Sequence, residues 1–270
     1  MADPSQSLAE LPRDGLPGLE PDRTITDWGR SERLTALADG TVLAFLYHYW
    51  LRVAVEGVEN VPASGGALLV ANRAGQLPLD AAMIVRAVRE EQRRPRVVHV
   101  ASAQTYADLP GLGMAITKLG IVSSHPANLH RLLFDERELV LTFPEGETAS
   151  WKSLRWRYLL QRFDRVPFVE AALRARVPIV PVAVLGGEEA MPSLGAIARL
   201  AARAGLPVTT GLPLPAKVRI RFLEPVPTGD LPGEPWLDRG LVEELGEQVR
   251  ALLQENLFEL LARRRSVWLG

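Results

Sequence analysis

Blocks of apolar residues recur along the chain, and their spacing predicts the secondary structure. Short continuous apolar runs are typical of strands that are covered by protein on both faces. One stretch, 51–58, instead alternates between apolar and polar positions, as a half-buried strand does. The predicted strands are 51–58, 67–71, 97–101, 121–123, 139–143, 179–185 and 218–222.

Other stretches place apolar residues three and four positions apart, which is the period of one face of an α-helix. The clearest lies at 241–261, where aliphatic residues fall on one face ahead of Arg263, Arg264 and Arg265. We predict an amphipathic helix at about 240–264, since positive charge at its end suits the helix dipole. The other predicted helices are 31–49, 80–89, 113–119, 129–134 and 168–174.

Strands and helices alternate over the middle of the chain, which is the pattern of a sheet layered between helices. We therefore predict an α/β fold, a single-domain layered sheet flanked by helices, over residues 26–270. Residues 1–25 are rich in Pro, Gly, Asp and Ser and lack apolar periodicity, so we predict a flexible tail there. The candidate chemistry falls within about 50–225.

Composition narrows the classes of function. The formal net charge of −1 argues against a protein that coats nucleic acid through a general positive field. There is no cysteine, which excludes disulfides, thiolate zinc sites and a cysteine nucleophile. No secretory signal is visible, and the most apolar early run, 42–51, is shorter than the about 20 residues of a membrane-spanning helix. We expect a cytoplasmic protein.

Polar residues follow three of the predicted strands, at the edge where open α/β sheets carry their functional groups. One of these exits contains Pro144-Glu145-Gly146, which can also end a strand for conformational reasons alone, because Pro cannot donate to the ladder and Gly takes a permissive dihedral. The occurrence of this turn together with the other two exits is more specific than the turn alone. The three exits read Asn72-Arg73-Ala-Gly-Gln-Leu-Pro-Leu-Asp80, Phe143-Pro144-Glu145-Gly146-Glu147 and, with its strand, Val177-Pro178-Ile-Val-Pro181-Val-Ala-Val-Leu-Gly186-Gly187-Glu188-Glu189.

These segments resemble the motif blocks of the lysophospholipid and glycerol-phosphate acyltransferase family. That family pairs a histidine with a downstream aspartate in its first block, has a Phe-Pro-Glu-Gly turn in its third and a Pro-Ile-Val-Pro strand in its fourth. The resemblance implies transfer of a fatty acyl group to a glycerolipid hydroxyl, with lysophosphatidate as the commonest acceptor, in phospholipid synthesis. It implies acyl-CoA or acyl carrier protein as the donor substrate, and no bound cofactor.

The resemblance also implies the site residues. Arg73 and Asp80 occupy the positions of the catalytic pair. Glu145 and Gly146 are expected to shape the pocket for the glycerol-phosphate end of the acceptor, and the loop 123–128 matches the family's second block. The full set of expected substrate contacts is Asn72, Asn128, Phe143, Pro144, Glu145, Gly146, Glu147, Arg157 and Arg162.

Arg157 and Arg162 belong to a stretch, 152–165, in which basic and aromatic residues are interleaved. Guanidinium groups suit the bidentate capture of phosphate, so this stretch favours an anion site beside Glu145. The alternative is an amphipathic surface with solvated cations.

Arg73 stands where the family has its histidine, which accepts a proton from the attacking hydroxyl. An arginine stays protonated and has no acceptor lone pair, so it is not a general base. In one interpretation Arg73 stabilises the oxyanion or holds a phosphate, while Asp80 or a water takes the proton. In the other, the chain is a catalytically silent homologue that binds lipid or acyl carrier. Asp80 is also a candidate N-cap for the helix at 80–89.

Neither a metal nor a spanning segment is predicted. The histidines His48, His99, His125 and His130 lack metal-ligand spacing, and His125 fits a solvated loop. Two segments, 45–50 and 263–268, combine aromatic residues with cations, as interfacial anchors do. Packing onto the core is the alternative for each. We predict peripheral association with the inner face of the cell membrane.

Overall fold

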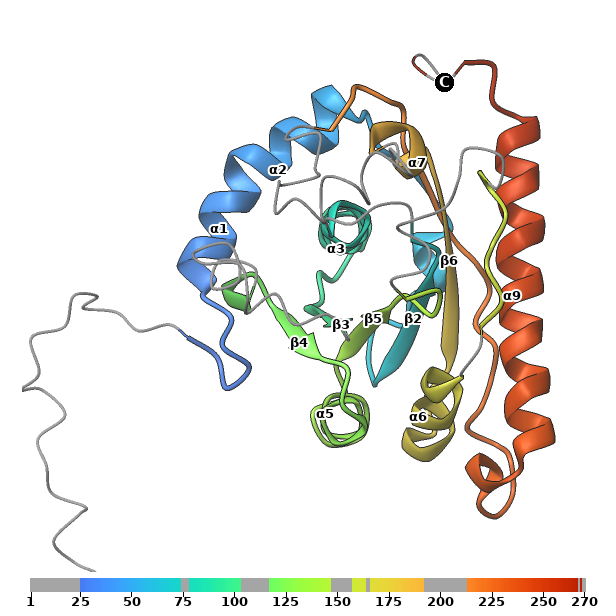
Figure 1. The fold of residues 1–270 in the computed structure, drawn as a ribbon. Helices are drawn as coiled ribbons and strands as arrows, with labels where there is room; N and C mark the ends of the chain where they lie inside the picture. Colours follow the sequence, from blue (N-terminus) through green and yellow to red (C-terminus); the bar gives the residue numbers. More distant parts are fainter. Residues whose placement is uncertain are drawn as a thin grey trace, which may run out of the picture.

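The computed structural model describes residues 25–73, 78–102, 117–146, 157–163, 166–191, 213–266 and 268. Within them, seven strands form one sheet in the order β1-β7-β6-β2-β5-β3-β4 (Figure 1). The strands from β6 to β4 run parallel, whereas β7 is antiparallel to β6 and parallel to β1. The strands are β1 (Ala54–Glu56), β2 (Ala67–Ala71), β3 (Val98–Ser102), β4 (Ile121–Ser123), β5 (Leu139–Thr142), β6 (Ile179–Leu185) and β7 (Arg219–Phe222).

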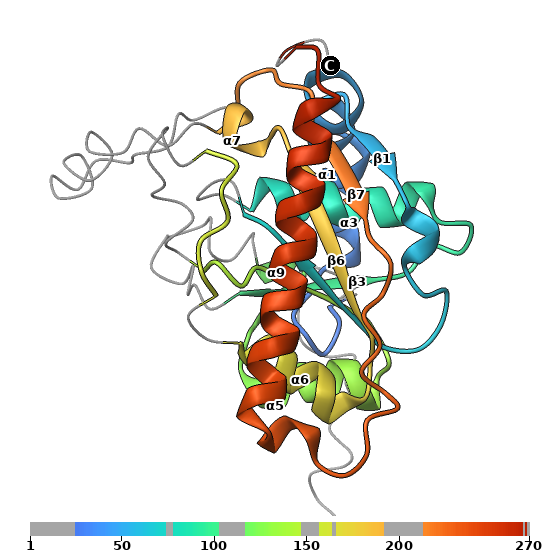
Figure 2. The same cartoon turned by 90° about the vertical axis from the view of Figure 1, so that its right-hand side faces the viewer.

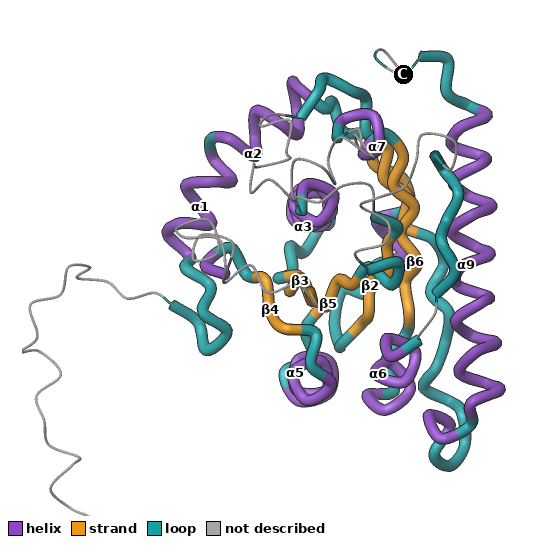
Figure 3. Tube along the Cα trace, viewed as in Figure 1, coloured by secondary structure: helices purple, strands orange, loops and turns teal. Residues whose placement is uncertain are grey.

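Helices cover both faces of the sheet. Figure 3 shows the strands as a row, with α3, α1 and α2 on one side and α5 and α6 on the other. The predicted α/β fold is thus confirmed. The helical elements are α1 (Glu32–Gly40), α2 (Val42–Phe45), the π-helix η2 (Leu46–Trp50), the 3-10 helix η3 (Val58–Asn60), α3 (Leu79–Glu91), α5 (Pro126–His130), the π-helix η5 (Arg131–Asp135), α6 (Pro167–Ala175), α7 (Gly187–Ala190), the 3-10 helix η8 (Pro235–Leu237) and α9 (Arg239–Ala262).

The continuous apolar character of β2 follows from its central position. Leu68 and Val70 join the core on the side of α5, α6 and α9, whereas Leu69 and Ala71 join the core on the side of α3. All five residues of the strand are buried. A strand covered on both faces has no solvent-facing position that would favour a polar residue.

Helix α9 packs along β6, as Figure 2 shows. Asp238 caps its N-terminus by accepting hydrogen bonds from the backbone N–H groups of Gly240 and Leu241. The apolar face predicted from the sequence is the buried one. Its buried side chains are Val242, Leu245, Val249, Leu253, Leu257 and Leu260.

The sequence placed some element boundaries wrongly. The predicted strand 51–58 is paired only over Ala54–Glu56, and the predicted helix 31–49 is interrupted at Thr41 and ends in a π-helix. The helix predicted at 129–134 begins at Pro126 and continues as a π-helix to Asp135. Most of the predicted helix 113–119 and of the tail 1–25 lies outside the described residues.

The sheet topology brings the candidate residues to one edge. β2 lies between β5 and β6, with Val70 in register with Thr142 and Ala71 with Val182. The carboxyl ends of these parallel strands therefore meet, and the residues that follow them are neighbours.

Candidate active site

Asn72 ends the pairing of β2. Its side-chain Nδ2 donates to the carbonyl of Val184 at 2.9 Å, and its Oδ1 accepts from the N–H of Val184 at 2.7 Å. The buried amide thereby takes the place of a main-chain ladder partner, so the chain can leave the sheet while β6 continues. We predicted a substrate contact for Asn72, and the structure gives its side chain a position that stabilises the sheet edge.

Glu145 lies at the centre of the turn that follows β5. The turn is closed by a hydrogen bond of 3.1 Å from the N–H of Gly146 to the carbonyl of Phe143, and Gly146 has a positive φ of 59°. Glu145 is 3% exposed; its Oε2 accepts from the N–H of Arg73 at 3.2 Å and its Oε1 from the N–H of Gln161 at 2.8 Å. One buried carboxylate therefore joins three segments that are distant in sequence.

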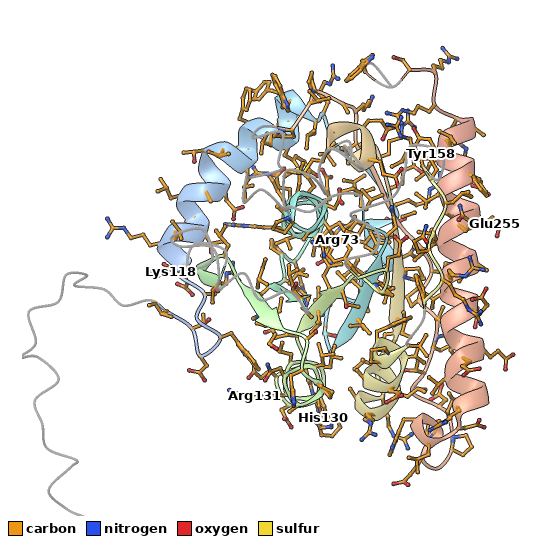
Figure 4. All side chains as sticks on the ribbon, in the orientation of Figure 1. Arg73, Lys118, His130, Arg131, Tyr158 and Glu255 are labelled. Atoms are coloured by element: carbon orange, nitrogen blue, oxygen red, sulfur yellow. The ribbon has the colours of Figure 1, made fainter. Side chains whose placement is uncertain are left out.

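Arg73 and Asp80 are both buried, at 8% and 6% exposure. Figure 4 shows Arg73 beside α3, at the end of β2. The N-cap residue of α3 is Pro78 and the helix begins at Leu79, so the interpretation of Asp80 as an N-cap is wrong. Because the proline ring fixes φ near helical values, the helix starts earlier than its apolar pattern indicates. Asp80 lies in the first turn, where the helix dipole favours a negative charge.

Residues 157–161, which we call the strap, run between the sheet edge and α9. The N–H of Tyr158 donates to Glu188 Oε2 at 3.0 Å. Gln254 of α9 holds two strap groups, because its Nε2 donates to the carbonyl of Tyr158 at 2.9 Å and its Oε1 accepts from the N–H of Leu160 at 2.8 Å. The strap is thus fixed from both α7 and α9.

A buried ionic cluster lies next to the strap. The Tyr158 hydroxyl donates to Glu189, and the guanidinium of Arg264 pairs with the same carboxylate oxygen. Burial, followed by the hydrogen bond to Glu189, raises the pKa of Tyr158 to about 12. This cluster was not predicted, because Glu189 lies 31 positions from Tyr158 and 75 from Arg264 and no local pattern joins them.

The two candidate phosphate-binding arginines are placed differently. The guanidinium of Arg157 lies over the ring of Tyr158, 5.7 Å from its centroid. Arg162 is exposed and lines an open groove of about 1130 Å³ between α6 and α9, together with Glu243 and Glu247. The Arg162 side chain thus lines this groove, whereas the main chain of the adjacent Gln161 contacts Glu145.

The remaining expected contacts lie in two places. Phe143 and Pro144 belong to the turn at the end of β5, where both are partly buried. Asn128 lies in α5 and donates from Nδ2 to the carbonyl of Ser123 at 3.2 Å. Glu147 lies outside the described residues.

Each of the four histidines makes a contact that the structure describes. His125 is the N-cap of α5, where its Nδ1 accepts from the N–H of Ala127. Nε2 of His48 lies 3.3 Å from Oε2 of Glu90. His99 contacts the ring of Trp28, and His130 that of Phe134. Across the described residues, no cluster of acidic or histidine side chains is suited to hold a metal ion.

A cavity of about 310 Å³ lies between α1, α3, β3 and β4. The wall of this cavity includes Pro78, two positions before the catalytic candidate Asp80, and Ala81, directly after it. Most of the lining is apolar, with charged groups from Arg30, Asp39, Arg89 and Arg96. The apolar lining residues are Leu43, Pro78, Ala81, Ala82, Val85, Pro95, Val97, Val98, Val100, Leu119 and Ile121.

The two candidate interfacial segments lie at one end of the molecule. Arg52, which follows η2, donates a hydrogen bond to the carbonyl of Trp268. Figures 1 and 2 agree in placing the C-terminal segment close to the end of α2 and η2. Phe45 and Tyr49 are 51% and 75% exposed there. Among the described helices, none has the length and hydropathy required to cross a bilayer.

A comparison with family models matches residues 52–185 to a family described as Acyltransferase. An uncharacterized protein of Mycobacterium tuberculosis is 39% identical over 261 residues, which cover 92% of this chain and 73% of that protein. An uncharacterized protein of Mycobacterium leprae is also 39% identical over 261 residues, covering 92% and 71%.

Two further relatives have descriptive names. A Gallus gallus protein named DGAT1/2-independent enzyme synthesizing storage lipids is 28% identical over 207 residues, covering 74% of this chain and 58% of that protein. Among solved structures, the 1-acyl-sn-glycerophosphate (LPA) acyltransferase PlsC from Thermotoga maritima matches with a TM-score of 0.57 at 21% identity. That match covers 86% of this chain and 80% of the other, and it shows a shared fold.

Proposed function

The chain belongs to the acyltransferase family, and on that premise we propose that it transfers a fatty acyl group to the free hydroxyl of a glycerolipid, with lysophosphatidate as the acceptor. The donor in this proposal is acyl-CoA or acyl carrier protein. The Thermotoga protein is named a 1-acyl-sn-glycerophosphate acyltransferase, and the chicken relative is named for the synthesis of storage lipids, which supports a glycerolipid acceptor.

The observation that carries the proposal is the joining of Arg73 to the Glu145 turn. The two segments that resemble the family's first and third blocks meet through a buried hydrogen bond within the region that the family model matches. Asp80 is buried at the start of α3 in the same region. The meeting of the two strand exits supports an acceptor pocket at this edge of the sheet, with Asp80 as the second member of the proposed catalytic pair.

The apolar cavity beside α3 supports a fatty acyl substrate. Its wall includes Pro78 and Ala81, so an alkyl chain that fills it would end near the helix turn that carries Asp80. Each CH₂ group that leaves water contributes about 0.8 kcal/mol to binding. An apolar cavity that reaches the first turn of α3 suits an acyl chain with a reactive carbonyl group at one end.

The chemistry must proceed without the family's histidine. The acceptor oxygen bonds to the thioester carbonyl carbon, the carbon–sulfur bond breaks, and the thiolate leaves. We assign the hydroxyl proton to the Asp80 carboxylate, because Arg73 has no lone pair with which to accept it. The fixed positive charge of Arg73 would stabilise the oxyanion that forms on the carbonyl oxygen.

A second candidate function is a silent homologue that binds lipid or acyl carrier. It is favoured by one observation, which is that an arginine replaces the general base. The contacts described above join the four histidines to residues other than Arg73 and Asp80. None of these contacts therefore brings an imidazole to the proposed catalytic pair. Loss of a general base typically costs about 10²- to 10⁴-fold in rate.

We further propose that the end of the molecule bearing η2 docks on the cytoplasmic face of the cell membrane, where the lipid substrates are found. Phe45 and Tyr49 project apolar surface, and Arg52 brings the basic segment 263–268 to the same end. Aromatic and basic groups together are typical of interfacial anchors.

Acyl transfer from a long-chain acyl-CoA to lysophosphatidate by the purified protein tests the proposal. The variants are Asp80→Asn and Arg73→His, with Asp230→Asn, an exposed aspartate, as the matched control. Parallel reactions replace the donor by acyl carrier protein and the acceptor by a neutral monoacylglycerol.

Turnover by the native chain and by Asp230→Asn, with loss in Asp80→Asn, would support the enzyme. Turnover by Arg73→His alone would identify the native chain as the silent homologue. Activity confined to the neutral acceptor would keep acyl transfer but replace lysophosphatidate as the acceptor.

A further inference from the structure

We propose that Gln254 of α9 is a positioning residue for the acyltransferase site, acting through the strap and Glu145 on the main chain of Arg73. This inference rests on the proposed function, because a positioning role needs a reaction to support. Gln254 is far from the motif segments in sequence and lies outside the region that matches the family model.

A continuous path of hydrogen bonds carries the inference. Gln254 fixes the carbonyl of Tyr158 at 2.9 Å and the N–H of Leu160 at 2.8 Å. The next strap N–H, that of Gln161, donates to Glu145 Oε1 at 2.8 Å. The second oxygen of Glu145 accepts from the N–H of Arg73 at 3.2 Å. Displacement of the strap therefore moves a main-chain donor to the Glu145 carboxylate.

A glutamine side chain is suited to holding the strap at position 254. A glutamine amide offers a donor and an acceptor on one planar group, so it can satisfy a carbonyl and an N–H group that lie two residues apart on the strap. An apolar side chain at 254 would leave both strap groups without their partner, and Leu160 is buried against the core. Loss of both bonds would favour detachment of the strap.

The support behind Gln254 is rigid. On either side of it in α9, Leu253 and Leu257 are fully or almost fully buried. Beyond the helix, Arg264 pairs with Glu189, which also accepts from the Tyr158 hydroxyl. α9 and the segment that follows it therefore both support the strap, and Gln254 of α9 contacts the strap main chain.

Gln254→Met tests the inference, because methionine keeps the length and helix propensity of glutamine but offers no comparable hydrogen bonds. The matched control is Glu255→Gln on the next residue. Figure 4 shows Glu255 directed outward from α9, whereas Tyr158 lies on the inner side of the helix. A positioning role and a general loss of stability are separated by the two measurements that follow.

The first measurement is residue-resolved amide hydrogen exchange on the native full chain, which does not depend on turnover. In Gln254→Met we expect the N–H groups of Leu160 and Gln161 to exchange about tenfold faster and that of Arg73 about fivefold faster. Amides in the middle of β6 should keep their native rates, as should every amide in Glu255→Gln. Faster exchange at the strap with no change at Arg73 would overturn the inference.

The second measurement is a double-mutant cycle in kcat/KM with Glu145→Gln, which retains the shape of Glu145 but cannot accept from both N–H groups. We expect each single change to lower kcat/KM about tenfold, and the pair to lower it about tenfold rather than about a hundredfold, because both interrupt one path. Additive losses would overturn the inference. If the native chain shows no turnover with any acceptor, the proposed function fails and hydrogen exchange at Arg73 alone decides the inference.

Discussion

The main-chain N–H of Arg73 donates to the carboxylate of Glu145 across the ends of two adjacent parallel strands. This contact fixes the backbone at position 73 independently of the side chain that stands there. The fold should therefore accept a histidine at this position, since the anchor belongs to the peptide group. An exchange of arginine for histidine here would therefore change the chemistry of the side chain and leave the strand exits in place.

The charge of Arg73 should be required for activity. Arg73→Gln removes the positive charge that we assign to the oxyanion, and we expect kcat to fall by about 10²- to 10³-fold. Arg73→Lys keeps the charge but loses the planar guanidinium, and we expect a smaller loss. Steady-state rates of acyl transfer, measured beside thermal unfolding of each variant, provide the test. Equal rates for Arg73→Gln and the native chain would contradict the assigned role.

The amide of Asn72 should be a major contributor to stability. Asn72→Leu leaves both the N–H and the C=O of Val184 buried without their partner, so we expect the free energy of unfolding to fall by about 2 to 4 kcal/mol. Asn60→Leu is the control, because Asn60 makes one partly buried hydrogen bond to Phe222 and should cost about 1 kcal/mol. Urea unfolding of both variants gives the comparison. Equal losses would show that the bridge to Val184 adds nothing.

The exposed aromatic residues near η2 should mediate membrane binding. Phe45→Ser combined with Tyr49→Ser removes two apolar side chains from the proposed docking end, and we expect at least a tenfold weaker partition into phosphatidylglycerol-containing liposomes. Phe134→Ser is the control, because Phe134 is 52% exposed, close to Phe45 at 51%, but follows α5 at the other end of the molecule. Cosedimentation measures the partition. Equal loss in the control variant would argue against a specific docking end.

His99 should make stability depend on pH. Burial, and then the charge of Arg30, lower the pKa of His99 in the folded chain, although Glu136 acts in the opposite direction. The unfolded chain, with a histidine pKa of about 6.5, therefore binds the proton more readily. Stability is complete above that value and is lost as the pH falls below it.

A substitution isolates this contribution. In His99→Leu the position cannot be protonated, so the melting temperature should fall less between about pH 7.5 and about pH 5.5 than in the native chain. Thermal unfolding at matched ionic strength measures the difference. Parallel pH dependences in the two proteins would refute the role of His99.

The bounds of the buried strands were predictable because the apolar run coincides with the buried stretch of chain. Strands β2, β4 and β6 begin and end where the apolar runs indicate, since both faces of β2 and β6 are covered by helices. The apolar face of α9 was predictable for a similar reason, because its spacing matches a single buried side. By contrast, β1 is an edge strand, and its pairing over Ala54–Glu56 is set by β7 rather than by its own pattern.

The sequence predicted which strand exits would meet, but not the contacts that join them. Motif resemblance and strand exits together pointed to Arg73, Asp80 and Glu145. No local signal in the sequence indicated that Glu145 would bind two backbone N–H groups, or that Gln254 would hold the strap, because both contacts depend on tertiary packing. The helix start at Leu79 was missed because the apolar pattern begins after the proline that sets it.

The strap has a further consequence for how the molecule assembles. Its hydrogen bonds to Gln254 join residues 94 and 96 positions apart, and the Tyr158 to Glu189 contact spans 31. The pairing of β1 with β7 joins Ala54 and Arg219, 165 positions apart, so the strap and the edge of the sheet both require the closure of large loops. During synthesis the strap would remain without its support until α9 has been made. The strap can take its final position only after α9 has packed on β6.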